Sequence, residues 1–123
     1  MTTKEIGDIG EKAAEKFLKK NGYKVVGRNM HFSHNEIDII AQNKEYIVFV
    51  EVKTRTLRGT VDLYGTPASA VTYSKQKRLI CAAKDYLREN ITDKQPRMDV
   101  IEIWLDEKIK AVKINHIIDA YGA

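Results

Sequence analysis

The sequence predicts an α/β fold with the element order αβββαββ. Two segments place apolar residues at three- and four-residue steps, as amphipathic helices do, and five others are rich in Val, Ile, Phe and Tyr, as strands are. The chain of 123 residues, 43% hydrophobic and 31% charged, has the composition of one ordinary globular domain, which we assign to residues 1–123. No apolar run approaches the roughly 20 residues that span a bilayer, so we expect no membrane segment and a cytoplasmic protein. The single cysteine, Cys81, excludes an internal disulfide and a multi-cysteine zinc site.

The first element is a helix over about Thr3–Lys20, in which Ile6, Ile9 and Ala13 begin one apolar stripe. An Asn-Gly pair follows and ends it. The next three elements are predicted as strands, at about Tyr23–Asn29, Glu36–Gln42 and Tyr46–Arg55. A second helix and a two-stranded hairpin complete the order, at about Ser74–Asn90, Met98–Leu105 and Lys108–Ile114.

The segment Thr56–Tyr73 has no hydrophobic periodicity, and loops of this length in small domains tend to be functional, so we treat it as a candidate substrate loop. The basic residues are concentrated in the same region. Between Glu51 and Asn90 eight basic residues stand against four acidic ones, which accounts for the whole net charge of +4. Such a local excess favours a polyanionic partner.

Carboxylates interrupt two of the apolar strands. Strand alternation puts Glu36 and Asp38 on one face of the first, and Glu51 and Lys53 on one face of the second. A four-residue hairpin loop, residues 43–46, would pair Asp38 with Glu51, and a two-residue loop would pair Glu36 with Glu51. Either loop places Asp38 within about 5 to 8 Å of Glu51, whereas an odd-length loop would separate them.

Charged side chains inside apolar strands need partners because an unpaired buried charge is costly. One explanation is an internal salt bridge of Lys53 with Glu51 or Glu36. The other is a metal site, because carboxylate oxygens with water and a substrate phosphate are what Mg²⁺ prefers, and a nearby lysine can position or activate the attacking water.

The pattern of Asp38 and Glu51-Val52-Lys53 resembles the PD-(D/E)xK signature of nucleases. The whole chain further resembles the YraN-like family of bacterial proteins, which is related in fold to archaeal Holliday junction resolvases. The family usually has Gly-Glu-Ile-Asp at this place in the sequence. This chain has Asn35 in place of the glycine, and asparagine also tolerates a positive φ. The segments that carry the resemblance are Gly10-Glu11 with Ala14, Asn29, Asn35–Asp38, Val48–Arg55, Lys75–Leu79 and Arg97–Val100.

This resemblance implies a restriction-endonuclease-like fold, in which a central mixed sheet is flanked by two main helices. It makes Asp38 and Glu51 ligands of Mg²⁺ or Mn²⁺, Lys53 the catalytic lysine and Glu11 a supporting acid. The helical wheel places Glu11 on the shoulder of the apolar stripe, where it could turn towards the sheet. Glu15 lies on the same flank, and a surface role for Glu11 is the alternative.

Gln76 falls near the centre of the apolar arc of the second helix, so we expect it to face the sheet. A buried amide needs partners. It either bonds backbone groups at the helix start or helps catalysis by orienting the Glu51 and Lys53 pair or a substrate phosphate. Four basic residues near the site are predicted to contact nucleic-acid phosphates: Arg55, Arg58, Lys75 and Arg78.

The leading hypothesis is a Mg²⁺-dependent endonuclease that hydrolyses phosphodiester bonds, with DNA as the favoured substrate. A nucleic-acid-binding module that keeps the fold without turnover is the main alternative. A third is an accessory protein whose acidic pocket only binds a divalent cation. The sequence leaves open DNA against RNA, branched against linear substrates, and monomer against homodimer.

Overall fold

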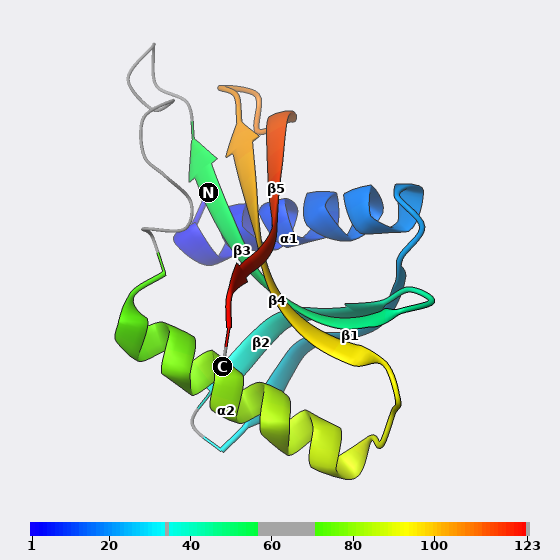
Figure 1. Cartoon of the computed structure of the whole chain (residues 1–123). Coiled ribbons are helices and arrows are strands. Elements are labelled where there is room, and N and C mark those ends of the chain that lie inside the picture. The colour runs from blue at the N-terminus through cyan, green and yellow to red at the C-terminus, as the bar shows by residue number, and fades with distance from the viewer. Residues whose placement is uncertain (34, 57–70, 123) are drawn as a thin grey trace.

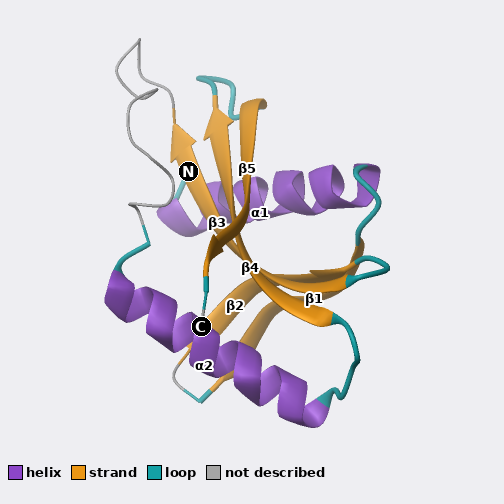
Figure 2. Ribbon diagram, viewed as in Figure 1, coloured by secondary structure: helices purple, strands orange, loops and turns teal. Residues whose placement is uncertain are grey.

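The computed structural model describes residues 1–33, 35–56 and 71–122, and it confirms an α/β nuclease-like fold with the order αβββαββ. One five-stranded sheet, in the order β1-β2-β3-β4-β5, carries a helix on each face (Figures 1 and 2). The sheet is mixed because β3 and β4 run parallel while all other neighbours are antiparallel. The elements are α1 (Thr3–Lys20), β1 (Lys24–Phe32), β2 (Asn35–Gln42), β3 (Tyr46–Thr56), α2 (Tyr73–Glu89), β4 (Gln95–Leu105) and β5 (Ala111–Tyr121).

Helix α1 begins with a capping box. The Thr2 hydroxyl accepts a hydrogen bond from the Glu5 backbone, and the Glu5 carboxylate accepts one from the Thr2 backbone, which satisfies N–H groups that a helix start leaves free. Ala14 and Leu18 on its inner side are fully buried. They pack against the face of the sheet that includes Ile39 and Val50. The apolar stripe predicted from the sequence is therefore the contact with the sheet.

Helix α2 covers the opposite face, mainly over β2 and β1 (Figure 1). Its buried residues Leu79, Ala82 and Ala83 pack in a second core with Ile40 and Phe49. The sheet is thus buried on both faces over its central strands, and β3 and β4 accordingly contain long runs of consecutive buried residues.

The last strand was predicted in the wrong place. The expected range, Lys108–Ile114, begins in a turn closed by Asp106, and β5 instead runs from Ala111 to Tyr121. Residues 115–121, which lie beyond the last predicted element, are therefore part of this strand. Its pattern is irregular because a bulge interrupts the pairing with β4, between Val100↔Ile117 and Met98↔Tyr121.

A buried ionic network fixes this bulge. The Asp99 carboxylate is fully buried and accepts hydrogen bonds from Arg97 Nε at 2.9 Å and from the Asp119 backbone at 3.0 Å, and it pairs with His116 Nε2 at 2.7 Å. Burial raises the pKa of Asp99, but the hydrogen bonds from His116 and Arg97 outweigh it and hold that pKa below its ordinary value. The network joins β4 to the end of β5, and the sequence alone gave no sign of it.

Helix α1 approaches β3 most closely at Gly10. A Cβ there would lie 1.9 Å from Thr54 Oγ1 and 2.8 Å from Thr54 Cβ, so only glycine fits without a shift of the helix. Gly7, one turn earlier in the same helix, has no atom within 4 Å of an added Cβ.

We therefore predict opposite effects for two glycine substitutions in α1. Gly10→Ala should destabilise the protein by about 1 to 3 kcal/mol, because it overpacks the helix against Thr54. Gly7→Ala should stabilise it by about 0.5 to 1 kcal/mol, because alanine favours the helix and meets nothing. Urea denaturation of both variants measures the difference, and equal stabilisation by the two would contradict the close approach.

Candidate functional site

The candidate site lies where the sheet divides. Strand β2 pairs with β3 only from Gln42↔Ile47 to Ile39↔Val50, although β2 stays paired with β1 down to Asn35. Beyond Ile39 a side chain takes over from the backbone ladder: Asp38 Oδ2 accepts a hydrogen bond of 2.8 Å from the Val52 backbone N–H. We call this point the fork.

The observed register is the one expected for a four-residue hairpin loop, because Gln42 pairs with Ile47. One further step along this register puts Asp38 opposite Glu51. Both residues line the same pocket. The expectation that these two carboxylates share one side of the sheet is thus confirmed.

The predicted strand alternation fails at one residue of β2. If Glu36 and Asp38 share one face, regular alternation puts Ile37 on the other with Ile39 and Ala41. Ile39 and Ala41 do pack in the α1 core, but Ile37 packs in the α2 core. The reason is the fork, because β2 leaves β3 just beyond Ile39 and is no longer held in the regular sheet.

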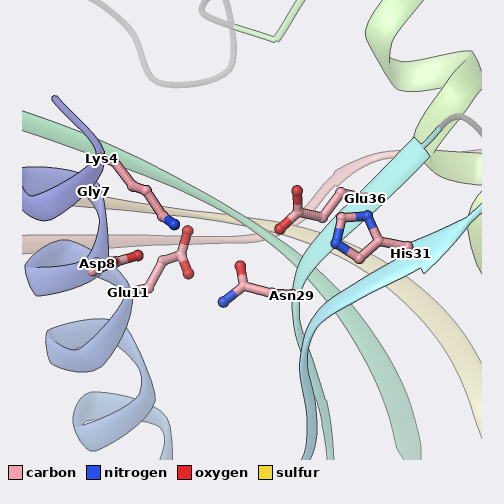
Figure 3. Close-up of a pocket in the computed structure, with 7 residues that line it drawn as sticks. All are labelled: Lys4, Gly7, Asp8, Glu11, Asn29, His31 and Glu36. Carbon is pink, nitrogen blue, oxygen red and sulfur yellow. The ribbon is translucent and has the colours of Figure 1, made fainter.

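Two pockets open at the fork. One, of about 350 Å³, is lined by Asn35, Glu36, Asp38, Glu51, Lys75, Arg78 and Leu79. The other, of about 470 Å³, is lined by Lys4, Gly7, Asp8, Glu11, Asn29, His31 and Glu36. Figure 3 shows the second, in which Lys4, Asp8 and Glu11 on α1 face Asn29, His31 and Glu36 on the strands. Glu36 borders both pockets, so the two adjoin.

The first pocket concentrates negative charge away from water. Glu51 is only 6% exposed, and its Oε1 atom lies 2.8 Å from Lys75 Nζ and 3.8 Å from Lys53 Nζ. Burial of the carboxyl group raises the pKa of Asp38 to about 7, and repulsion from Glu51 is the second-largest cause. Two ammonium groups therefore lie beside Glu51, while burial and repulsion keep Asp38 partly protonated at neutral pH. A cation between the two carboxylates would relieve this repulsion.

Glu11 does not join the pair. It lines the second pocket, and its Oε1 atom lies 3.4 Å from Arg28 NH2 on β1, whose other terminal nitrogen contacts Glu15. Burial raises the pKa of Glu11, and Arg28 counteracts this. In the described part of the chain no three Asp, Glu, His or Cys side chains converge on one point. The structure thus brings Asp38 and Glu51 together and leaves Glu11 in the adjoining pocket.

Two further predicted residues have structural partners. The Gln76 amide nitrogen donates to the Val71 carbonyl at 3.0 Å, as in the alternative of a helix-start glutamine, and Gln76 does not line the pocket. Arg55 Nε bonds Glu102 Oε2 at 2.8 Å, and Glu102 is fully buried. The Arg55 guanidinium therefore neutralises a buried acid through Nε, while its side chain is 32% exposed. Its contact with nucleic-acid phosphate stays a prediction.

Of the other three predicted phosphate contacts, the structure describes two. Lys75 and Arg78 line the pocket, as predicted for residues near the site. Arg58 and most of the candidate substrate loop lie outside the described residues. The direct contact of Lys75 with Glu51 was not anticipated, although a signal was present: Lys75 precedes the buried Leu79 by four residues and so shares its side of the helix.

Tyr121 is a second unanticipated neighbour, at the end of β5. It contributes to the packed region around Glu51 and Leu79. Among the described residues its hydroxyl is one of the few buried side-chain polar atoms without a hydrogen-bond partner. Burial and the charge of Glu51 raise the pKa of this phenol, so it stays protonated and adds no further negative charge.

Comparison with known proteins identifies related chains. The model of the uncharacterised protein family UPF0102 matches residues 10–103. A UPF0102 protein of Caldanaerobacter subterraneus is 43% identical over 120 residues, which cover 96% of this chain and 95% of the relative. One of Clostridium acetobutylicum is 42% identical over 119 residues, covering 96% and 94%. No helix in the described part of the chain is long and apolar enough to cross a membrane.

We predict that the Asp38 carboxyl titrates with a midpoint near pH 7, because it is buried beside Glu51. Its pKa lies above the ordinary value of 3.8, so the stability that the neutral acid gives is lost as the pH rises through the folded-state pKa. Carboxyl-carbon NMR measures the midpoint, and Glu51→Gln should lower it by removing the repulsion.

Asp99 is the internal control in the same spectra, because its pKa lies below the ordinary value and it should stay ionised throughout. If Asp38 titrates near 3.8 in the wild-type protein, the described charge environment of the fork is wrong.

Proposed function

This chain belongs to the uncharacterised protein family UPF0102, the YraN-like family, and from its geometry we propose that it is a Mg²⁺-dependent nuclease that hydrolyses phosphodiester bonds in DNA. The observation that carries the proposal is that Asp38 and Glu51 line one pocket at the fork, with Lys53 Nζ 3.8 Å from Glu51 Oε1. The Lys53 ammonium thus lies close to this carboxylate pair, although Lys53 itself does not line the pocket.

The pocket suits a hard divalent cation. Asp38 and Glu51 would hold it, since carboxylate oxygens are the ligands that Mg²⁺ and Mn²⁺ favour. The raised pKa of Asp38 supports this fit, because a second charge of the same sign beside Glu51 costs free energy that a cation would remove. A volume of about 350 Å³ also leaves room for a phosphate group. When bound, Mg²⁺ lowers the pKa of water and polarises a phosphate oxygen.

The chain's own residues supply the other requirements. The Val52 N–H holds Asp38 Oδ2, so one ligand is oriented before the ion arrives. The Lys53 ammonium can position the attacking water and stabilise the charge that develops on the phosphate. Lys75 and Arg78 lie on the other wall, where they can contact phosphates on either side of the cleaved bond. Such contacts fix the substrate without reading its sequence.

We predict that Lys53→Ala lowers Mg²⁺-dependent cleavage by about 10² or more and leaves DNA affinity within several-fold, because Lys53 acts on the transition state and is one phosphate contact among several. The assay compares duplex, single-stranded and branched DNA, with affinity measured separately. Lys16→Ala is the matched control: it removes the same charge from an exposed position on α1 and should cleave like the wild type.

Wild-type protein that binds DNA but cleaves none of these substrates would contradict the nuclease and favour the binding module. Full cleavage by Lys53→Ala would contradict the role of Lys53. Loss of divalent-ion binding in Glu51→Gln, which keeps the side-chain shape without the charge, tests the metal site independently of turnover.

A further inference from the structure

We propose that Lys75 is the built-in counter-ion of Glu51 and that a divalent cation must displace its ammonium to bind. The inference rests on the proposed metal site and adds a competition to it. In this view the two lysines near Glu51 have different roles: Lys53 stays beside the carboxylate, and Lys75 exchanges with the cation.

The distances separate the two lysines. Lys75 Nζ lies 2.8 Å from Glu51 Oε1, the distance of a charge-assisted hydrogen bond, whereas Lys53 Nζ lies 3.8 Å from the same oxygen. A carboxylate that is 6% exposed depends on a close partner of this kind, because water cannot replace it. Glu51 therefore has its main positive partner on α2 and not on its own strand.

Their positions in the fold also differ. Lys53 stands inside β3, where the backbone pairs with Glu102 of β4 along a continuous parallel ladder. Lys75 stands in the first turn of α2, and its side chain is 37% exposed against 24% for Lys53. A lysine stem of four carbons at a helix surface can swing its ammonium into solvent or along the pocket wall.

Electrostatic repulsion favours the exchange. A divalent cation on Glu51 would bring two positive charges to an oxygen that Lys75 already contacts, and like charges at this separation repel strongly where water is scarce. Movement of Lys75 relieves the repulsion. The freed ammonium can move into solvent, because the Lys75 side chain is already 37% exposed.

The consequence is measurable as a penalty on cation affinity. Wild-type protein must break the Lys75–Glu51 pair before Mn²⁺ binds, and Lys75→Met has no such pair to break although the side chain keeps a similar length. We expect Lys75→Met to bind Mn²⁺ about tenfold more tightly than the wild type in calorimetry. Mn²⁺ should also raise the thermal midpoint of Lys75→Met more than that of the wild type.

Arg78→Met is the matched control, because it removes one positive charge from the same pocket and helix without touching the pair with Glu51. We expect its Mn²⁺ affinity to rise by less than about threefold, which is the general effect of one nearby charge in a screened site. Lys75→Gln, which removes the charge but keeps a hydrogen-bond donor, should tighten Mn²⁺ binding in the same direction as Lys75→Met.

Three results would overturn the inference. Equal Mn²⁺ affinity in wild type, Lys75→Met and Lys75→Gln would overturn it while leaving the proposed metal site intact. An equal gain in Mn²⁺ affinity in Arg78→Met would mean that Lys75 acts only as one nearby positive charge among several. Absence of Mn²⁺ binding in the wild type and in both Lys75 variants would overturn the metal site and this inference together.

Discussion

The departure of β2 from β3 at Ile39 is the constraint on which the candidate site depends. Up to that residue the two strands form an ordinary antiparallel ladder, and beyond it Asp38 uses its own carboxylate to accept the Val52 N–H that the ladder would have satisfied. That single hydrogen bond caps the open end of the strand pair and also aims an acid at Glu51. The Asp38 side chain thus both satisfies a backbone N–H of β3 and contributes a carboxylate to the candidate site.

The partners of the buried acids distinguish Asp38 from the acids that have a structural role. Asp99 has Arg97, His116 and a backbone N–H, and Arg55 neutralises Glu102. These acids have cationic partners supplied by the fold. Asp38 has a backbone N–H and a like-charged neighbour, which is why its pKa is raised while that of Asp99 is lowered. A buried carboxyl group with a raised pKa of this kind is typical of functional sites.

Local patterns sufficed for much of this arrangement. The polar loop between β2 and β3 and the alternation of the two strands predicted that Asp38 and Glu51 face each other, because hairpin register follows from loop length. What the patterns missed depends on partners distant in sequence. The pairing of Arg55 with Glu102, the contact of Lys75 with Glu51 and the position of β5 are set by how β4 and α2 pack, and no spacing within a short segment encodes them. Gln76 shows the same limit, since the sequence left open whether it bonds backbone or orients the site, and the structure pairs it with the Val71 carbonyl.

The central claim is that Asp38 and Glu51 together hold a divalent cation at the fork. Anomalous diffraction from a crystal soaked in Mn²⁺ tests it most directly, because the signal locates the ion without reference to activity. The account predicts a peak within about 2 to 2.5 Å of carboxylate oxygens of both residues. A peak confined to the adjoining pocket of Asp8, Glu11 and Glu36, or no peak at saturating Mn²⁺, would contradict it.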